Sequence, residues 1–353
     1  QEEIRGLSDD NRTIPAQDRP IIVPSAAREI ALTVFPGRAV HGTHYGRPDE
    51  AVEVIFYEAE PEFYRSVFLD PYDGAVLDTE DHRAGFFAFM LRGHRYLWLP
   101  KEIGGAVVKY SILLFLVIIT TGLLLWWPKN RKTAKQRFSF QWKPTTRWRR
   151  KNFDLHTVTG FYVYALAFVF AFTGSVISFP WLYHLTYRAA GGDAEPQFLI
   201  PDNRSAATEA TDTASLPMDR LIALLQREDP EALSFEIHYP HSDSASIYVE
   251  VSHREGVYYS SDYRFFDQRT LEEIETPSLY GKYAEAGFAD KVIRMNYDIH
   301  VGAIGGLPGK MIAFVASLLV ASLPVTGFLI WLGRRRKKTP RRQVRLSQEA
   351  VLL

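Results

Sequence analysis

Three long apolar segments dominate the hydropathy pattern of the chain, at 110–127, 157–183 and 311–332. A helix needs roughly 20 apolar residues to cross the hydrocarbon core of a bilayer, where its backbone polar groups bond only to each other. We therefore predict an α-helical membrane protein. Its transmembrane helices, each extended to include flanking residues, are expected at 91–128, 153–186 and 297–333.

Outside these segments the pattern changes to short runs with strand or helix periodicity. The stretch 23–90 has helical spacing at 24–35, followed by strand-like runs at 52–56, 64–69 and 75–78. The stretch 216–296 repeats this order, with a helix at 217–226 and strand-like runs at 233–239, 245–251 and 257–266. Proline begins both helices, and alternation with period two is typical of half-buried strands. The pattern predicts two small α+β modules.

The remaining stretches are polar and connect these elements. We predict a tether at 1–22, a basic loop at 129–152, a linker at 187–215 and a tail at 334–353. The linker is rich in Ala, Gly, Thr and Asp, a composition typical of irregular connections.

Charge is balanced overall but not along the chain. The 353 residues contain 41 Lys or Arg and 41 Asp or Glu, yet 129–151 has ten basic residues and no acidic one. Cytoplasmic loops are enriched in Lys and Arg, so this loop and the C-terminal tail are expected in the cytoplasm. Both modules are then expected on the opposite side, in a periplasm-like compartment. A basic loop between two spans is a topology signal, so we predict no nucleic-acid partner.

The predicted topology requires export of a region that contains no export signal. The sequence begins with Gln1, and residues 1–100 have no apolar run that could direct translocation. Either a signal peptide has been removed, or a further transmembrane helix precedes this numbering. We favour the further helix.

Each predicted span follows a histidine and contains a Thr-Gly pair. The histidines are His94, His156 and His300, and the pairs begin at Thr121, Thr173 and Thr326. Small residues allow close helix packing in lipid, so the pairs are expected at helix contacts. His94 and His300 come before spans that begin on the same side of the membrane, whereas His156 comes before a span that begins on the other side.

Two imidazoles on facing membrane helices are the donor set of a bis-histidine haem. The glycines at 104–105, together with Gly302, Gly305 and Gly306, offer room for a flat macrocycle near His94 and His300. A histidine at a membrane interface also bonds to lipid headgroups, which is the alternative for all three. His184 fits that interfacial role better, although it could take the place of one of the three histidines as a haem ligand. The other histidines, His41, His44, His82, His238, His241 and His253, are expected at the surface.

Other cofactor chemistry has little support. The chain has no cysteine, so it supplies no thiol chemistry and no iron–sulfur ligands. The glycines at 302–309 do not follow a strand, as a dinucleotide fingerprint requires, and neither a Walker lysine motif nor HExxH occurs.

Several motifs together resemble the PepSY-associated transmembrane helix family. They are the DPYDGAVLD turn at 70–78, the histidine before each span, the Thr-Gly pairs and the segment IHVGAIGGLPGK at 299–310. The resemblance covers 24–338 and extends to FoxB-like ferric-siderophore reductases of the inner membrane. It implies two haem b groups, with His94 and His300 as axial ligands of the outer haem iron. His156 would be an iron ligand of the inner haem, with a partner on the further N-terminal helix.

The resemblance leads to a functional hypothesis: a haem-containing oxidoreductase passes electrons across the membrane to a periplasmic ferric siderophore. The electron donor would be a quinol or a cytoplasmic reductase, and Arg or Tyr residues within 240–290 would contact the chelate. The alternative is a non-enzymatic, membrane-anchored interaction or regulatory protein. A transporter is less well supported, because the spans contain almost no charges or broken helices.

Overall fold

The computed structural model describes residues 12–128, 130, 134, 137–194, 196–204, 215–276 and 279–335. These fall into two compact units. The first comprises the described parts of Gln1–Ile112 and Thr173–Gly306, and the second those of Leu113–Phe172 and Leu307–Leu353. The basic loop, the linker and the C-terminal tail that the sequence predicts lie partly outside the described residues.

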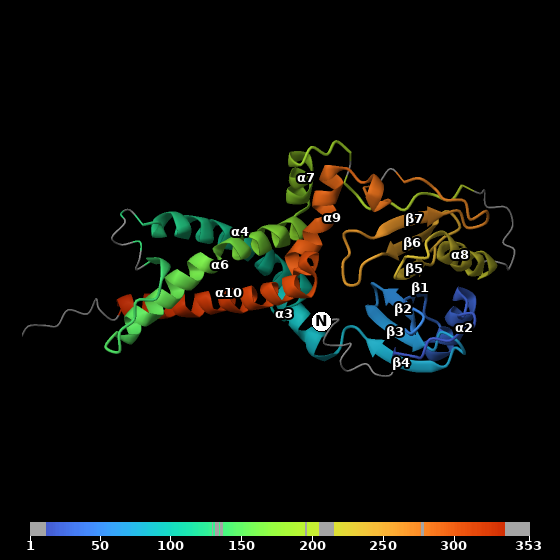
Figure 1. The fold of residues 1–353 in the computed structure, drawn as a ribbon, viewed down its shortest axis with the longest axis horizontal. Helices are drawn as coiled ribbons and strands as arrows, with labels where there is room; N and C mark the ends of the chain where they lie inside the picture. The colour runs from blue at the N-terminus through green and yellow to red at the C-terminus, as the bar shows by residue number, and fades with distance from the viewer. Residues whose placement is uncertain are drawn as a thin grey trace, which may run out of the picture. The chain divides into compact units, whose positions relative to one another are not determined.

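The first unit contains one antiparallel sheet of seven strands, in the order β4-β3-β2-β1-β5-β6-β7 (Figure 1). The strands before the first apolar helix are β1 (Val40–Tyr45), β2 (Val52–Glu58), β3 (Phe63–Leu69) and β4 (Val76–Asp81). The later strands are β5 (Ser234–His238), β6 (Ile247–Ser252) and β7 (Asp262–Phe266). The sequence predicted all of these except β1.

The two α+β repeats share this sheet. β1 pairs with β5 in antiparallel register, with Thr43 opposite Ile237. Helices α2 (Pro24–Val34) and α8 (Ser215–Glu228) pack against one face of the sheet and against each other. Their side chains join those of both strand sets in a single hydrophobic core, with Ala31, Val54, Leu221 and Val249 all fully buried.

Residues 12–22 differ from the tether that their polarity predicts. Thr13 forms a bridge with Glu50, Ile14 is buried, and the Arg12 guanidinium binds the carboxylates of Asp78 and Glu80. Ion pairs and a buried isoleucine therefore attach this segment to the sheet. The rest of the predicted tether, 1–11, lies outside the described residues.

Three helices are long and apolar enough to cross a membrane, at Lys101–Trp126 (α4), Trp148–Ser178 (α6) and Ala303–Arg335. The last comprises a short 3₁₀ turn, η3 (Ala303–Gly305), and α10 (Gly306–Arg335). The search covered only the described residues. The prediction of apolar spans is therefore confirmed by length and composition.

Each span is joined to a shorter helix by a break, which a proline or a glycine explains in two of the three cases. α3 (Gly85–Tyr96) is followed by left-handed Leu97 and Trp98 before α4. α6 ends before Pro180, the first residue of α7 (Pro180–Ala189), because proline disfavours helical geometry in the preceding residue. α9 (Phe288–Val301) ends at left-handed Gly302. The short 3₁₀ turn η2 (Tyr283–Glu285) comes shortly before α9.

Candidate functional site

A five-residue motif occurs twice in the helices, as NFDLH at 152–156 of α6 and NYDIH at 296–300 of α9. Its Asn and His are four residues apart, so they share one face of the helix. The sequence analysis singled out the histidines but missed the asparagines and aspartates. The repetition of Asn, Asp and His at equal spacing was the available signal.

In the first unit, the motif of α9 contacts the Thr-Gly pair at the end of α6. Nδ1 of His300 lies 3.1 Å from Oγ1 of Thr173. The side-chain amide of Asn296 donates to the carbonyl oxygen of Thr173 at 3.1 Å. A Cβ added to Gly174 would lie 2.9 Å from Cε1 of His300, so only glycine leaves room for the imidazole here.

In the second unit, the motif of α6 contacts the Thr-Gly pair of α10 in the same way. Nδ1 of His156 lies 3.0 Å from Oγ1 of Thr326, and the Asn152 amide donates to the Thr326 carbonyl at 3.0 Å. A Cβ on Gly327 would lie 3.2 Å from Cε1 of His156. The third pair differs, because a Cβ on Gly122 would meet no atom within 4 Å.

The hydroxyl of Thr326 determines which nitrogen of His156 carries the proton. Oγ1 of Thr326 donates to backbone oxygens of its own helix, Ser322 at 3.2 Å and Leu323 at 3.0 Å. Its single hydrogen is used there, so the oxygen accepts a hydrogen bond from Nδ1–H of His156. The lone pair of the neutral imidazole is then on Nε2, the state in which histidine binds a metal.

His94 of α3 lies beside His300 of α9. Their ring centroids are 6.1 Å apart and the ring planes are inclined by 42°. The turn between α3 and α4 fixes the end of α3: the Trp98 ring packs over Gly93, and its Nε1–H donates to the Phe89 carbonyl at 2.8 Å. The two histidines predicted to act together are therefore neighbours within the first unit.

This pair fits a metal held between two imidazoles. With metal–nitrogen bonds of about 2 Å, two coaxial imidazole rings have centroids about 6 Å apart. Cβ atoms added to Gly305 and Gly306 would meet nothing within 4 Å, so the backbone after α9 is open. No group of three or more His, Asp or Glu side chains arranged to hold a metal ion occurs among the described residues. His94 and His300 are the residues of this unit that would hold a haem, and their neutral imidazoles would supply its nitrogen ligands.

The other predicted contributors have different surroundings. Gly104 is in contact with the backbone of Tyr96, so it serves the α3–α4 turn, and Gly302 is the left-handed end of α9. His184 lies on α7, where its ring is 5.9 Å from that of Tyr183.

A second cluster of titratable side chains lies on the sheet face opposite α2 and α8. His44 of β1 is directly across from Glu53 of β2 and Glu236 of β5, and Glu236 is across from Glu250 of β6. Like charges at such positions repel. Burial, and then the charges of Glu250 and Glu53, raise the pKa of Glu236 to about 8. Glu236 therefore tends to keep its proton near neutral pH.

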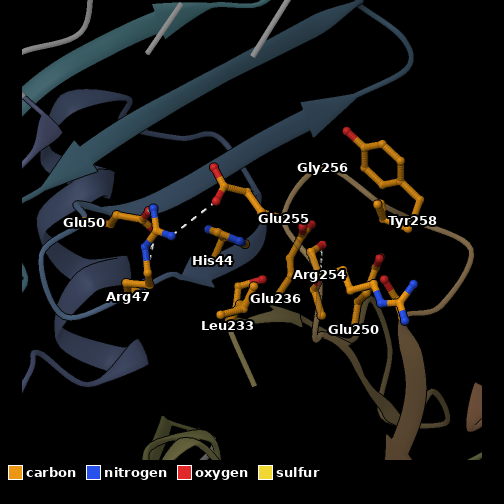
Figure 2. A pocket seen from close by; sticks show the side chains of 14 residues that line it. His44, Arg47, Glu50, Leu233, Glu236, Glu250, Arg254, Glu255, Gly256 and Tyr258 are labelled. Carbon is orange, nitrogen blue, oxygen red and sulfur yellow. Dashed lines mark hydrogen bonds and ion pairs between the residues drawn. The ribbon is translucent and has the colours of Figure 1, made fainter. Parts of the chain in front are cut away.

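Some side chains of this cluster line a cavity of about 280 Å³, which Figure 2 shows from close by. His44, Glu236 and Glu250 line it. Arg47 at its edge pairs with Glu50 at 2.7 Å and with Glu255 at 3.2 Å. Arg47 is thus neutralised by two carboxylates of the lining.

Two histidines expected at the surface are instead largely covered. His82 is 15% exposed, bonds to Ser66 Oγ at 2.7 Å and stacks on Tyr64. His238 stacks on Tyr248, and burial together with the charge of His41 lowers its pKa to about 3. Both lie on the sheet face that carries Glu53, Glu236 and Glu250, where side chains of neighbouring strands cover them.

The long apolar helices and the α+β sheet define a membrane protein with a folded domain outside its spans. The profile of the family described as PepSY-associated TM region matches residues 2–334. The chain therefore belongs to the PepSY-associated transmembrane family, as its motifs predicted. No curated protein gives a significant match.

Proposed function

We propose that this protein is a haem-containing reductase that passes electrons across the inner membrane to a ferric siderophore. The observation that carries the proposal is the 6.1 Å separation of the His94 and His300 rings, which come from different helices. Bound haem b would supply one-electron exchange with Fe(III). Reduction favours iron release, because oxygen-donor chelators hold Fe(II) less tightly than Fe(III).

The chain's own residues orient the ligands. Thr173 fixes the ring of His300 through Nδ1, and Asn296 ties the same turn of α9 to α6. Partners of this kind fix the orientation and tautomer of a metal-binding histidine. His156 has the equivalent contacts with Thr326 and is assigned to a second haem at the other end of the span.

The test is optical spectroscopy of the purified, detergent-solubilised chain. We expect b-type bands in the dithionite-reduced spectrum and their reoxidation when a ferric siderophore is added. His94→Ala and His300→Ala should each remove the haem bound at this pair. His241→Ala, at an exposed loop position, should leave it unchanged.

A correctly inserted protein without haem would contradict the reductase proposal. Its sheet would then serve the alternative role of a membrane-anchored interaction module.

A further inference from the structure

The first unit contains a second cavity, of about 360 Å³, that is lined almost entirely by tyrosines. Its lining residues are Tyr258, Tyr259, Tyr263, Tyr280, Arg294 and Tyr297. They come from the β6–β7 connection, from β7, from the segment before η2 and from α9. We call this cavity the tyrosine pocket.

An arginine and an aspartate of α9 hold the pocket walls to that helix. The Arg294 guanidinium donates to the carbonyl oxygens of Tyr259 at 3.0 Å, Gly281 at 3.2 Å and Ser261. The Asp298 carboxylate accepts the backbone N–H groups of Tyr258 and Tyr259. Arg294 is 5% exposed and Asp298 is fully buried. Charge-assisted hydrogen bonds with little access to water are among the stronger ones, so the pocket is rigidly built onto α9.

The same helix carries His300, which lies close to the pocket wall. Tyr297 precedes His300 by three residues, and residues so spaced on a helix have Cβ atoms about 5–6 Å apart. Arg294 precedes it by six residues, or about 9 Å along the helix axis. A molecule in the tyrosine pocket would therefore lie within two helical turns of the proposed redox ligand.

The lining defines the chemistry of such a molecule. Its phenols are hydrogen-bond donors, and burial raises the pKa of Tyr263, which keeps that phenol protonated. The only charged side chain among the described lining residues is the cationic Arg294, with its ring contacts to Tyr263 and Tyr283 at 5.2 Å. Flat aromatic faces and hydroxyl donors suit an organic surface rich in oxygen acceptors. Arg294, whose N–H groups are bonded to the wall carbonyls, adds positive charge behind that surface without a direct contact.

We propose that the tyrosine pocket binds the organic shell of a ferric chelate whose exposed groups are neutral or anionic oxygen donors. This inference rests on the proposed reductase function. Fe(III) in the bound chelate gains one electron and becomes Fe(II), while the donor held at His94 and His300 is oxidised by one electron.

Binding can be tested separately from reduction with gallium. The Ga(III) complex of a linear trihydroxamate has the shape of the ferric complex but is not reduced under these conditions. Its Kd for the full chain in detergent is measured by calorimetry for wild type, Tyr258→Leu and Tyr297→Leu. We expect at least tenfold weaker binding in both variants, with unchanged haem spectra.

Tyr57→Leu is the matched control. Tyr57 and Tyr297 are each 49% exposed, but Tyr57 lies on β2, away from the residues lining the pocket. Its variant should bind the gallium complex as wild type does.

Equal Kd values for wild type and both pocket variants would overturn the inference. If the ferric complex still reoxidised reduced haem in that case, the reductase proposal would stand without this pocket. Conversely, gallium binding that depends on Tyr258 and Tyr297, without any haem reoxidation, would support the pocket and overturn the reductase.

Discussion

The side-chain amide of Asn152 donates to the backbone carbonyl of Thr326 at 3.0 Å. His156, four residues after Asn152 on the same helix, contacts the hydroxyl of the same threonine. Asn296 makes the same bond to Thr173 at 3.1 Å. Equivalent contacts therefore occur twice: the motif of α6 binds the Thr-Gly pair of α10, and the motif of α9 binds the Thr-Gly pair of α6. Such contacts between membrane helices hold backbones close together and fix the rotation of each helix.

Substitution of Gly174 should affect the outer histidine pair directly. A methyl group in Gly174→Ala would lie 2.9 Å from Cε1 of His300, so the imidazole must shift from its position beside His94. We expect loss or marked weakening of the haem bound there, measured as haem per protein and as a change in the reduced spectrum.

Gly122→Ala is the control for this experiment, because its added Cβ has open space in the structure. Gly327→Ala should have an intermediate effect and act only on His156, at 3.2 Å. Haem content equal in the Gly174 and Gly122 variants would contradict the assigned role of His300.

Removal of Asp298 should loosen the wall of the tyrosine pocket. Hydrogen bonds to a charged group contribute about 1.5–3 kcal/mol each. In Asp298→Ala, the amides of Tyr258 and Tyr259 should exchange with deuterium roughly 10- to 100-fold faster. Asp243→Ala, in an exposed loop, should leave these amides protected. Unchanged exchange in the Asp298 variant would show that the wall is held by other contacts.

The pKa of Glu236 predicts a pH-dependent stability of the sheet. A carboxyl group whose pKa is raised to about 8 in the folded state favours folding while it is protonated. That contribution is present below the unfolded pKa of about 4.3 and is lost as the pH rises through 8.

We therefore expect the melting temperature of wild type to fall between pH 5 and pH 8.5, and Glu236→Gln to reduce that fall. Exposed Glu272→Gln should follow wild type. A steeper decline in the Glu236 variant would have the wrong sign for this explanation.

The shared core predicts that damage in one repeat spreads to the other. Leu221 on α8 is fully buried among residues of both strand sets. Leu221→Ala should cost about 2–5 kcal/mol. Hydrogen exchange should then accelerate at Val54 of β2 as well as at Val249 of β6. Leu185→Ala, at an exposed position of α7, serves as the control, and protection lost only around Val249 would indicate independent modules.

The apolar spans and most elements of the sheet could be predicted because their signals are local. Span length, the proline that begins α2 and alternating strands can all be read within one stretch of sequence. β1 was missed because its sequence, VHGTHY, has polar residues and a glycine where a strand usually carries apolar ones. Its partner β5 lies about 190 residues later, so no local pattern shows the pairing.

The histidine pair was predicted only in part for a similar reason. Position in the sequence placed His94 and His300 near the start of two spans. Their separation depends on the turn after α3, where Leu97 and Trp98 adopt left-handed conformations that non-glycine residues seldom take. The contact of Asn296 with Thr173 joins segments more than a hundred residues apart, which explains why the asparagine was not recognised.

The pairing of β1 with β5 has a consequence for biosynthesis. When the ribosome has made the first four strands, β1 still lacks its second neighbour, and two membrane-spanning helices must be synthesised before β5 appears. Throughout that interval a row of backbone hydrogen-bonding groups stays available to other nascent chains, which is the situation that promotes aggregation. A chaperone that shields this strand, or slow initiation that keeps nascent copies apart, would raise the yield of correctly assembled protein.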